Sequence, residues 1–122
     1  MQVKFIKTQL LNSANYILNN NIGEYITIGS LFSVYGIRFT QDITYLYIYN
    51  GEHLFETPLE FFEIVNPTVF SKWKIKIWDN GDISLWPNLF YTESFFEGFA
   101  EREIEQRSEF EFLRTHVELQ LV

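Results

Sequence analysis

Residues 72–87, KWKIKIWDNGDISLWP, constrain the fold most strongly, because polar and apolar residues alternate on both sides of an Asn80-Gly81 pair. This pattern predicts a β-hairpin. A two-residue loop would set Asp79 opposite Asp82, and like charges directly opposite each other destabilise a sheet. A three-residue loop with Gly81 in the left-handed conformation avoids that pair and is the loop we predict.

The three-residue loop also decides which side chains share a face of this hairpin. It makes one face entirely apolar, from the pairs Ile77–Ile83, Ile75–Leu85 and Trp73–Pro87. The other face carries the remaining side chains, Lys72, Lys74, Lys76, Trp78, Asp82, Ser84 and Trp86. We expect the Ile/Leu face to organise the sheet, and the basic face to lie at the surface with its lysine stems packed on tryptophan.

A second hairpin is predicted over residues 43–57, where a β-branched and aromatic stretch meets an Asn50-Gly51 pair. A two-residue type I′ turn gives the pairs Ile48–His53, Leu46–Phe55 and Tyr47–Leu54. The face that we expect to point to the core then holds Leu46, Ile48, His53 and Phe55. The opposite face holds Tyr45, Tyr47, Tyr49, Glu52, Leu54 and Glu56.

Helices are predicted on either side of the 72–87 hairpin. Thr57-Pro58-Leu59-Glu60 is a strong helix start, so residues 59–65 are expected to be helical and to end before Pro67. A further helix is predicted over 93–106, and residues 89–91 are expected to be extended. Three further predictions are an amphipathic helix over 3–19, with a short strand at its start as the alternative, a helical turn over 29–36, and a final strand within 110–122.

Together these elements predict an α+β fold in which residues 1–122 form a single domain. We expect a single antiparallel sheet of roughly four to six strands, built on the two Asn-Gly hairpins, with two or three helices packed on it. The absence of cysteine excludes disulfides, thiolate nucleophiles and iron–sulfur clusters, and we expect no cofactor and no metal. No secretory signal and no apolar run of roughly 18 residues is present, so a cytoplasmic location is expected.

The net charge of −7 is unevenly distributed along the chain. Residues 39–71 contain five acidic residues and no Lys or Arg, and residues 92–122 contain eight acidic residues against three arginines. An acidic field repels nucleic acid and anionic membranes and speeds encounter with cationic partners. It also keeps an aromatic-rich protein soluble, so charge alone is consistent with both interpretations.

Two acidic surfaces are candidates for partner binding. Glutamates recur at every fourth position from residue 93: Glu93, Glu97, Glu101, Glu105 and Glu109. Like charges at this spacing cost a helix roughly 0.2–0.5 kcal/mol per pair, so the row is either presented to a basic surface or simply solvated. The second candidate is the tyrosine–carboxylate face of the 43–57 hairpin, which suits Arg or Lys from a partner unless another element covers it. The partner-binding residues predicted from both are Tyr45, Tyr47, Tyr49, Glu52, Glu56, Glu97, Glu101 and Glu105.

Two other candidate sites are weaker. Lys72, Lys74 and Lys76 beside tryptophans resemble a single-stranded nucleic-acid surface, but three lysines are a small footprint on an acidic chain. His53 and His116 are candidates for acid–base catalysis, yet no catalytic motif surrounds either, and structural histidines are the commoner case. We therefore expect neither nucleic-acid binding nor enzyme activity.

The stretches Lys72–Phe99, KWKIKIWDNGDISLWPNLFYTESFFEGF, and Tyr45–Phe62, YLYIYNGEHLFETPLEFF, carry a family resemblance. The chain resembles the small immunity proteins that bacteria encode beside toxin domains in contact-dependent growth inhibition and other polymorphic toxin systems. This resemblance implies a cytosolic, non-catalytic protein that binds and blocks a cognate toxin, often by covering a nuclease active site. Such nucleases are frequently basic, which would fit the acidic surfaces.

Two other functions remain open from the sequence. One is a structural or adaptor domain that forms oligomers through its aromatic face. The other is a small hydrolase or nuclease that depends on His53 and His116.

Overall fold

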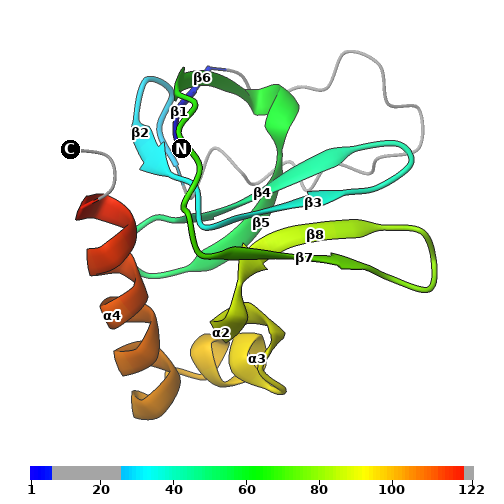
Figure 1. Cartoon of the computed structure of the whole chain (residues 1–122). Coiled ribbons are helices and arrows are strands. Elements are labelled where there is room, and N and C mark those ends of the chain that lie inside the picture. The colour runs from blue at the N-terminus through cyan, green and yellow to red at the C-terminus, as the bar shows by residue number, and fades with distance from the viewer. Residues whose placement is uncertain (7–25, 120–122) are drawn as a thin grey trace.

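Two antiparallel sheets and a set of C-terminal helices make up the computed structural model, which describes residues 1–6 and 26–119 (Figure 1). The smaller sheet has the order β2-β1-β6 and contains β1 (Gln2–Phe5), β2 (Leu31–Ser33) and β6 (Phe62–Asn66). The larger sheet has the order β5-β4-β3-β8-β7 and contains β3 (Gly36–Phe39), β4 (Thr44–Tyr49), β5 (Leu54–Pro58), β7 (Trp73–Ile77) and β8 (Ile83–Pro87). The α+β class is confirmed, and the prediction of a single sheet is wrong.

The chain changes sheets at η1 (Leu59–Phe61), the 3-10 turn that joins β5 to β6. The helix predicted over 59–65 is wrong, because only these three residues turn and the β-branched Ile64 and Val65 continue as a strand. Antiparallel pairing with β1, including Phe62 opposite Phe5, satisfies the backbone of β6. The turn predicted over 29–36 is likewise replaced by β2 and the start of β3. Residues 2–5 are the strand alternative for the N-terminus, and the rest of the predicted 3–19 helix lies outside the described residues.

The register of the 72–87 hairpin is confirmed. Trp73 pairs with Pro87, Ile75 with Leu85 and Ile77 with Ile83, and Gly81 has φ = 91°. The burial of its faces is not as expected. Ile75 and Ile77 are 69% and 72% exposed, whereas Ser84 and Trp86 on the opposite face are buried.

The 43–57 hairpin forms with a longer loop than predicted. Ile48 pairs with Phe55 and Tyr49 with Leu54, a shift of two residues from the predicted register. The Asn50 side-chain oxygen accepts hydrogen bonds from the N–H groups of Glu52 and His53, which stabilises the wider loop. A shift of two keeps each strand residue on its predicted face, but it moves His53 out of the core and into the loop.

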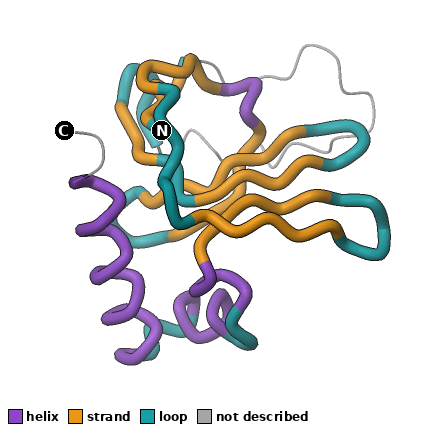
Figure 2. Tube along the Cα trace, viewed as in Figure 1, coloured by secondary structure: helices purple, strands orange, loops and turns teal. Residues whose placement is uncertain are grey.

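Three helices follow β8: α2 (Asn88–Tyr91), α3 (Phe95–Ala100) and α4 (Ile104–Leu119). In Figure 2 the two short helices lie below the larger sheet and α4 runs along one end of it. The predicted extension at 89–91 is wrong because these residues belong to α2, and the predicted 93–106 helix is split between α3 and α4. The predicted strand within 110–122 is also wrong as far as Leu119, because Phe110, Leu113 and Val117 are buried at helical spacing on α4.

The hydrophobic core fills both sides of the larger sheet. On one face, Leu46 and Ile48 of β4 are fully buried where β2 and η1 pack against the strand. On the other face, aromatic side chains of β4 and β8 pack against those of the helices, as Tyr47 does against Phe96 and Tyr49 against Phe110. The helices therefore cover Tyr47 and Tyr49 on the tyrosine face of the 43–57 hairpin.

Candidate partner-binding surface

Arg38, in the middle of β3, organises the tyrosine–carboxylate face. Its Nε and one terminal nitrogen donate to the two oxygens of Glu56, at 2.8 and 2.6 Å. Its other terminal nitrogen donates to Asp82 at 2.8 Å, and the guanidinium lies 4.8 Å from the ring centroid of Tyr45. The hydroxyl of Tyr47 donates to the same Glu56 carboxylate. The predicted site residues Tyr45, Tyr47 and Glu56 thus meet around an arginine of their own chain.

The electrostatics of this cluster keep Arg38 and Tyr47 protonated. The hydrogen bonds from Arg38 to Glu56 raise the pKa of the guanidinium above its ordinary value. Burial raises the pKa of the Tyr47 hydroxyl, and its hydrogen bond to Glu56 raises it further. Both groups keep their protons at neutral pH, so the cluster links three strands as a fixed ion-pair network.

Tyr49 and Glu52 are also engaged within the fold. The Tyr49 ring packs 4.9 Å from the ring of Phe110, centroid to centroid, on α4. The Glu52 carboxylate forms a salt bridge with Arg102, and its backbone carbonyl accepts a hydrogen bond from Arg107 at 2.8 Å. Tyr49 and Glu52 of the 43–57 hairpin, both predicted to bind a partner, therefore hold the helices in place.

The remaining predicted residues, Glu97, Glu101 and Glu105, lie on the outside of the α3–α4 segment. We define the C-terminal acidic surface as the six exposed carboxylates of this segment: Glu93, Glu97, Glu101, Glu103, Glu105 and Glu109. Within residues 1–6 and 26–119, no salt bridge involves any of the six. By contrast, Glu111 and Glu118 further along α4 both pair with Arg114. The acidic surface therefore carries charge that the described fold does not compensate.

A break between α3 and α4 shapes this surface. Arg102 has φ = 63°, its N–H donates to the Phe99 carbonyl, and the Glu103 N–H donates to the Gly98 carbonyl. These are the two hydrogen bonds of a Schellman ending, with a left-handed residue after the last turn. Because the chain changes direction here, the glutamates do not form one straight row, and the predicted four-residue repeat is divided between two helices.

An aromatic pocket of about 570 Å³ opens between the β7–β8 hairpin and α3. Its lining combines aromatic rings with charged and polar groups of the hairpin loop: Arg38, Trp78, Asp79, Asn80, Asp82, Trp86, Phe90 and Phe96. Asp79 adds a negative charge at the loop, and the Lys76 ammonium lies 3.8 Å from the centroid of the Trp78 ring, so this ring already contacts one cation of the chain. This pocket suits the side chain of a lysine or arginine.

Neither the aromatic pocket nor the pairing of Arg38 with Glu56 and Asp82 was predicted from the sequence. One signal was present for Arg38, which is the lone Lys or Arg between Lys7 and Lys72. In a stretch with this many acids, a single arginine in an apolar strand is expected to pair internally. No sequence signal places Phe96 beside Trp78, because α3 reaches the hairpin only through tertiary packing.

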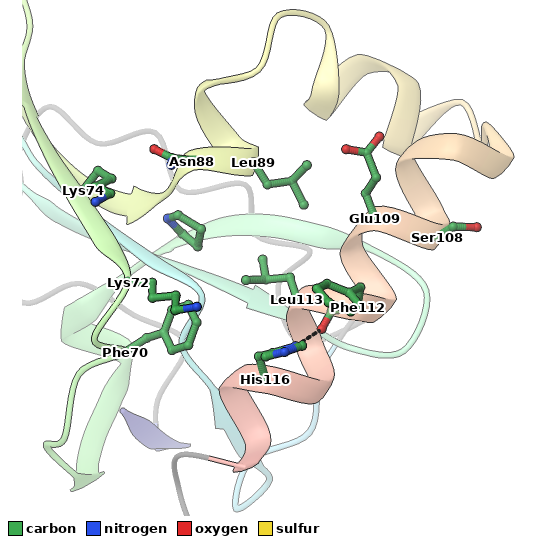
Figure 3. Close-up of a pocket in the computed structure, with 11 residues that line it drawn as sticks. Phe70, Lys72, Lys74, Asn88, Leu89, Ser108, Glu109, Phe112, Leu113 and His116 are labelled. Atoms are coloured by element: carbon green, nitrogen blue, oxygen red, sulfur yellow. Dashed lines mark hydrogen bonds between the residues drawn. The ribbon is translucent and has the colours of Figure 1, made fainter.

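A groove of about 870 Å³ separates β7 from α4 (Figure 3). Lys72 and Lys74 lie on the strand side, and Glu109, Phe112 and His116 lie on the helix side. Phe70, Leu89 and Leu113 contribute apolar surface between these walls. The groove therefore offers ammonium groups beside an apolar floor.

The two histidines do not meet in the structure. His53 lies in the β4–β5 loop, 3.9 Å from the Glu52 carboxylate, near the start of α4. Arg107 of α4 marks the place of this loop on the helix, because it donates to the carbonyl of Glu52, the residue before His53. His116 lies nine residues beyond Arg107 on the same helix, about 13 Å along its axis. Its Nδ1 is 2.8 Å from the Phe112 carbonyl oxygen and its ring packs on Phe112. The pair is not arranged for joint acid–base chemistry.

Among the described residues, no group of three or more His, Cys, Asp or Glu side chains is placed to hold a metal ion. No helix in that part of the chain is long and apolar enough to cross a membrane. No protein-family model, curated protein or solved structure matches the chain.

Proposed function

We propose that this protein is a non-catalytic binding protein that neutralises a basic protein partner, and that the partner is a cognate toxin, as the resemblance to immunity proteins implies. The observation that carries the proposal is the C-terminal acidic surface, whose six carboxylates have no salt bridge within the described fold. Maintaining like charges in one short segment costs stability, and a cationic partner would offset that cost.

The aromatic pocket supports a basic partner independently of the summed charge. Phe96, which lines the pocket, directly precedes Glu97 of the acidic surface. An arginine or lysine of the partner that entered the pocket beside Phe96 would therefore lie near carboxylates that attract the rest of the partner. Cation–π contacts of this kind are worth about 0.5–2 kcal/mol, depending on how fully the cation is desolvated.

The direct test is co-expression with the product of the adjacent open reading frame. We expect that product to be toxic alone, and the pair to be viable and to copurify as a stable complex. Charge reversal of Glu97, Glu101 and Glu105 to lysine should slow association and weaken binding, most strongly at low ionic strength.

A matched control separates the surface from the net charge. Reversal of Asp42, Glu63 and Glu118 to lysine changes the net charge by the same amount, keeps the Arg114–Glu111 salt bridge and leaves the acidic surface intact. Equal losses in both triple variants would show that only net charge matters. An unchanged association rate in the first triple variant would exclude the C-terminal acidic surface as the interface.

A further inference from the structure

We propose that β7 is a docking edge for an antiparallel strand, supplied by a partner, in which acidic residues alternate with aliphatic ones. Strand β7 lies at the end of the larger sheet and pairs only with β8 among the described residues. An edge strand presents a row of backbone donors and acceptors that a further strand can use.

The hairpin register identifies which backbone groups are open. The Trp78 N–H donates to the Asp82 carbonyl at 2.8 Å, which makes these two residues a hydrogen-bonded pair. Antiparallel residue pairs alternate between hydrogen-bonded and non-hydrogen-bonded, so the backbone N–H and C=O groups of Lys76 and Lys74 point to β8. The N–H and C=O groups of Ile75 and Ile77 therefore point away from the sheet, toward the open edge.

The two faces of β7 specify opposite chemistry for the side chains of an added strand. One face presents Ile75 and Ile77, which are 69% and 72% exposed. The other presents Lys72, Lys74 and Lys76, none of which forms a salt bridge with another described residue, although the Lys76 ammonium lies 3.8 Å from the Trp78 ring centroid. Because directly opposed residues share a face, the fitting strand is aliphatic on one face and acidic on the other.

The groove beside α4 extends this edge. Lys72 and Lys74 form its strand wall, and α4 forms the facing wall (Figure 3). Side chains of an added strand that point to the lysine face would enter the groove next to these ammonium groups. Charge complementarity favours carboxylates on the Lys72–Lys74 side of the groove, away from Glu109 on the helix side, and the apolar floor accommodates their methylene stems.

A second copy of this chain fits the edge poorly. Antiparallel self-pairing that joins three or more residues of β7 must be centred on Lys74, Ile75 or Lys76, because the strand has five residues. Those three registers set Lys74 opposite Lys74, Lys74 opposite Lys76, and Lys76 opposite Lys76, and like charges directly opposite each other are unfavourable. The lysines thus disfavour pairing of β7 with β7 of a second copy, whereas they would attract the carboxylates of an acidic strand.

The test uses the full-length protein and a capped peptide of about eight residues in which Glu alternates with Val. We expect binding that weakens as salt is added, with amide chemical-shift changes at Ile75 and Ile77, and no binding of the corresponding Lys-Val peptide. Ile75→Pro removes an outward-facing donor, without breaking a β7–β8 hydrogen bond, and shortens the side chain; it should weaken binding about tenfold, whereas Ile75→Val, which shortens the side chain but keeps the donor, should not.

Modified peptides make the same test from the ligand side, even if the proline variant does not fold. In an antiparallel pairing the Val residues oppose Ile75 and Ile77, so N-methylation of Val should abolish binding and N-methylation of Glu should preserve it. Equal effects of both modifications, or equal binding of the Glu-Val and Lys-Val peptides, would overturn the proposal. So would a dimer in sedimentation experiments that Ile75→Pro dissociates, because the edge would then bind a second copy.

Discussion

At the scale of single residues, Arg38 shows how one cation can convert an acidic stretch into structure. Its guanidinium accepts no hydrogen bonds and donates along fixed directions, which suits a bidentate contact with Glu56 and a third bond to Asp82. The two carboxylates come from β5 and the β7–β8 hairpin, on either side of the central strands. Arg38 therefore ties together strands that are not neighbours in the sheet.

Arg38→Met should lower the free energy of unfolding by about 1–2 kcal/mol, because it leaves two partly buried carboxylates without their donor. Urea denaturation at neutral pH measures this change. Arg102→Met is the matched control, since it removes an exposed salt bridge to Glu52 and should cost less than about 0.5 kcal/mol. Equal costs for the two variants would show that the Arg38 network adds no more stability than a surface pair.

At the scale of elements, α3 is short because left-handed residues delimit it at both ends. Ser94 precedes α3 with φ = 63°, and Arg102 follows it with the same value. Neither is glycine, so each carries a cost of about 1 kcal/mol for its conformation. Helical spacing alone does not reveal these breaks, because the hydrogen bonds that stabilise them come from backbone groups with no sequence signature.

Ser94→Gly should raise the free energy of unfolding by about 0.5–1 kcal/mol, because glycine adopts the left-handed conformation without steric cost. Ser108→Gly, at an exposed position inside α4, should lower it by about 0.5 kcal/mol, since glycine is a poor helix former. Thermal and urea unfolding of both variants provide the measurement. The same sign of change in both would contradict a left-handed Ser94.

At the scale of the whole molecule, an aromatic layer holds the helices on the larger sheet. Phe110 of α4 is fully buried and packs against Tyr35 at the start of β3, Tyr49 of β4 and Phe99 of α3, with ring centroids 4.9–5.1 Å apart. One side chain therefore joins the sheet to two helices. The C-terminal acidic surface keeps its shape only if this junction is intact.

Phe110→Ala should lower the free energy of unfolding by about 3–5 kcal/mol, because it removes a buried ring and leaves a cavity. Phe112→Ala, two residues along the same helix at a 71% exposed position, should cost less than about 0.5 kcal/mol. Denaturant titration compares the two. Similar losses would mean that α4 does not pack on the sheet through the Phe110 face.

Much of the candidate site was predictable one residue at a time, but its assembly was not. Exposed glutamates at 97, 101 and 105 follow from acidity in an amphipathic segment, and the structure leaves them exposed. The burial of Tyr47 and the pairing of Glu56 could not be predicted, because they depend on what covers the 43–57 hairpin and on where Arg38 lies. The Arg38–Glu56 hydrogen bonds join positions 18 residues apart, and the contact of Tyr47 with Phe96 joins more distant ones, which local patterns do not encode.

The sequence by itself determined the α+β class, the two hairpins and the register of residues 72–87, because turn chemistry and period-two alternation act between near neighbours. Tertiary structure alone decided that η1 sends β6 into a second sheet, that α3 and α4 separate at Arg102, and that Trp86 rather than Ile75 is buried. Alternation specifies which side chains share a face of a hairpin. Which face leaves water depends on where the aromatic helices dock, and that packing is settled by the whole chain.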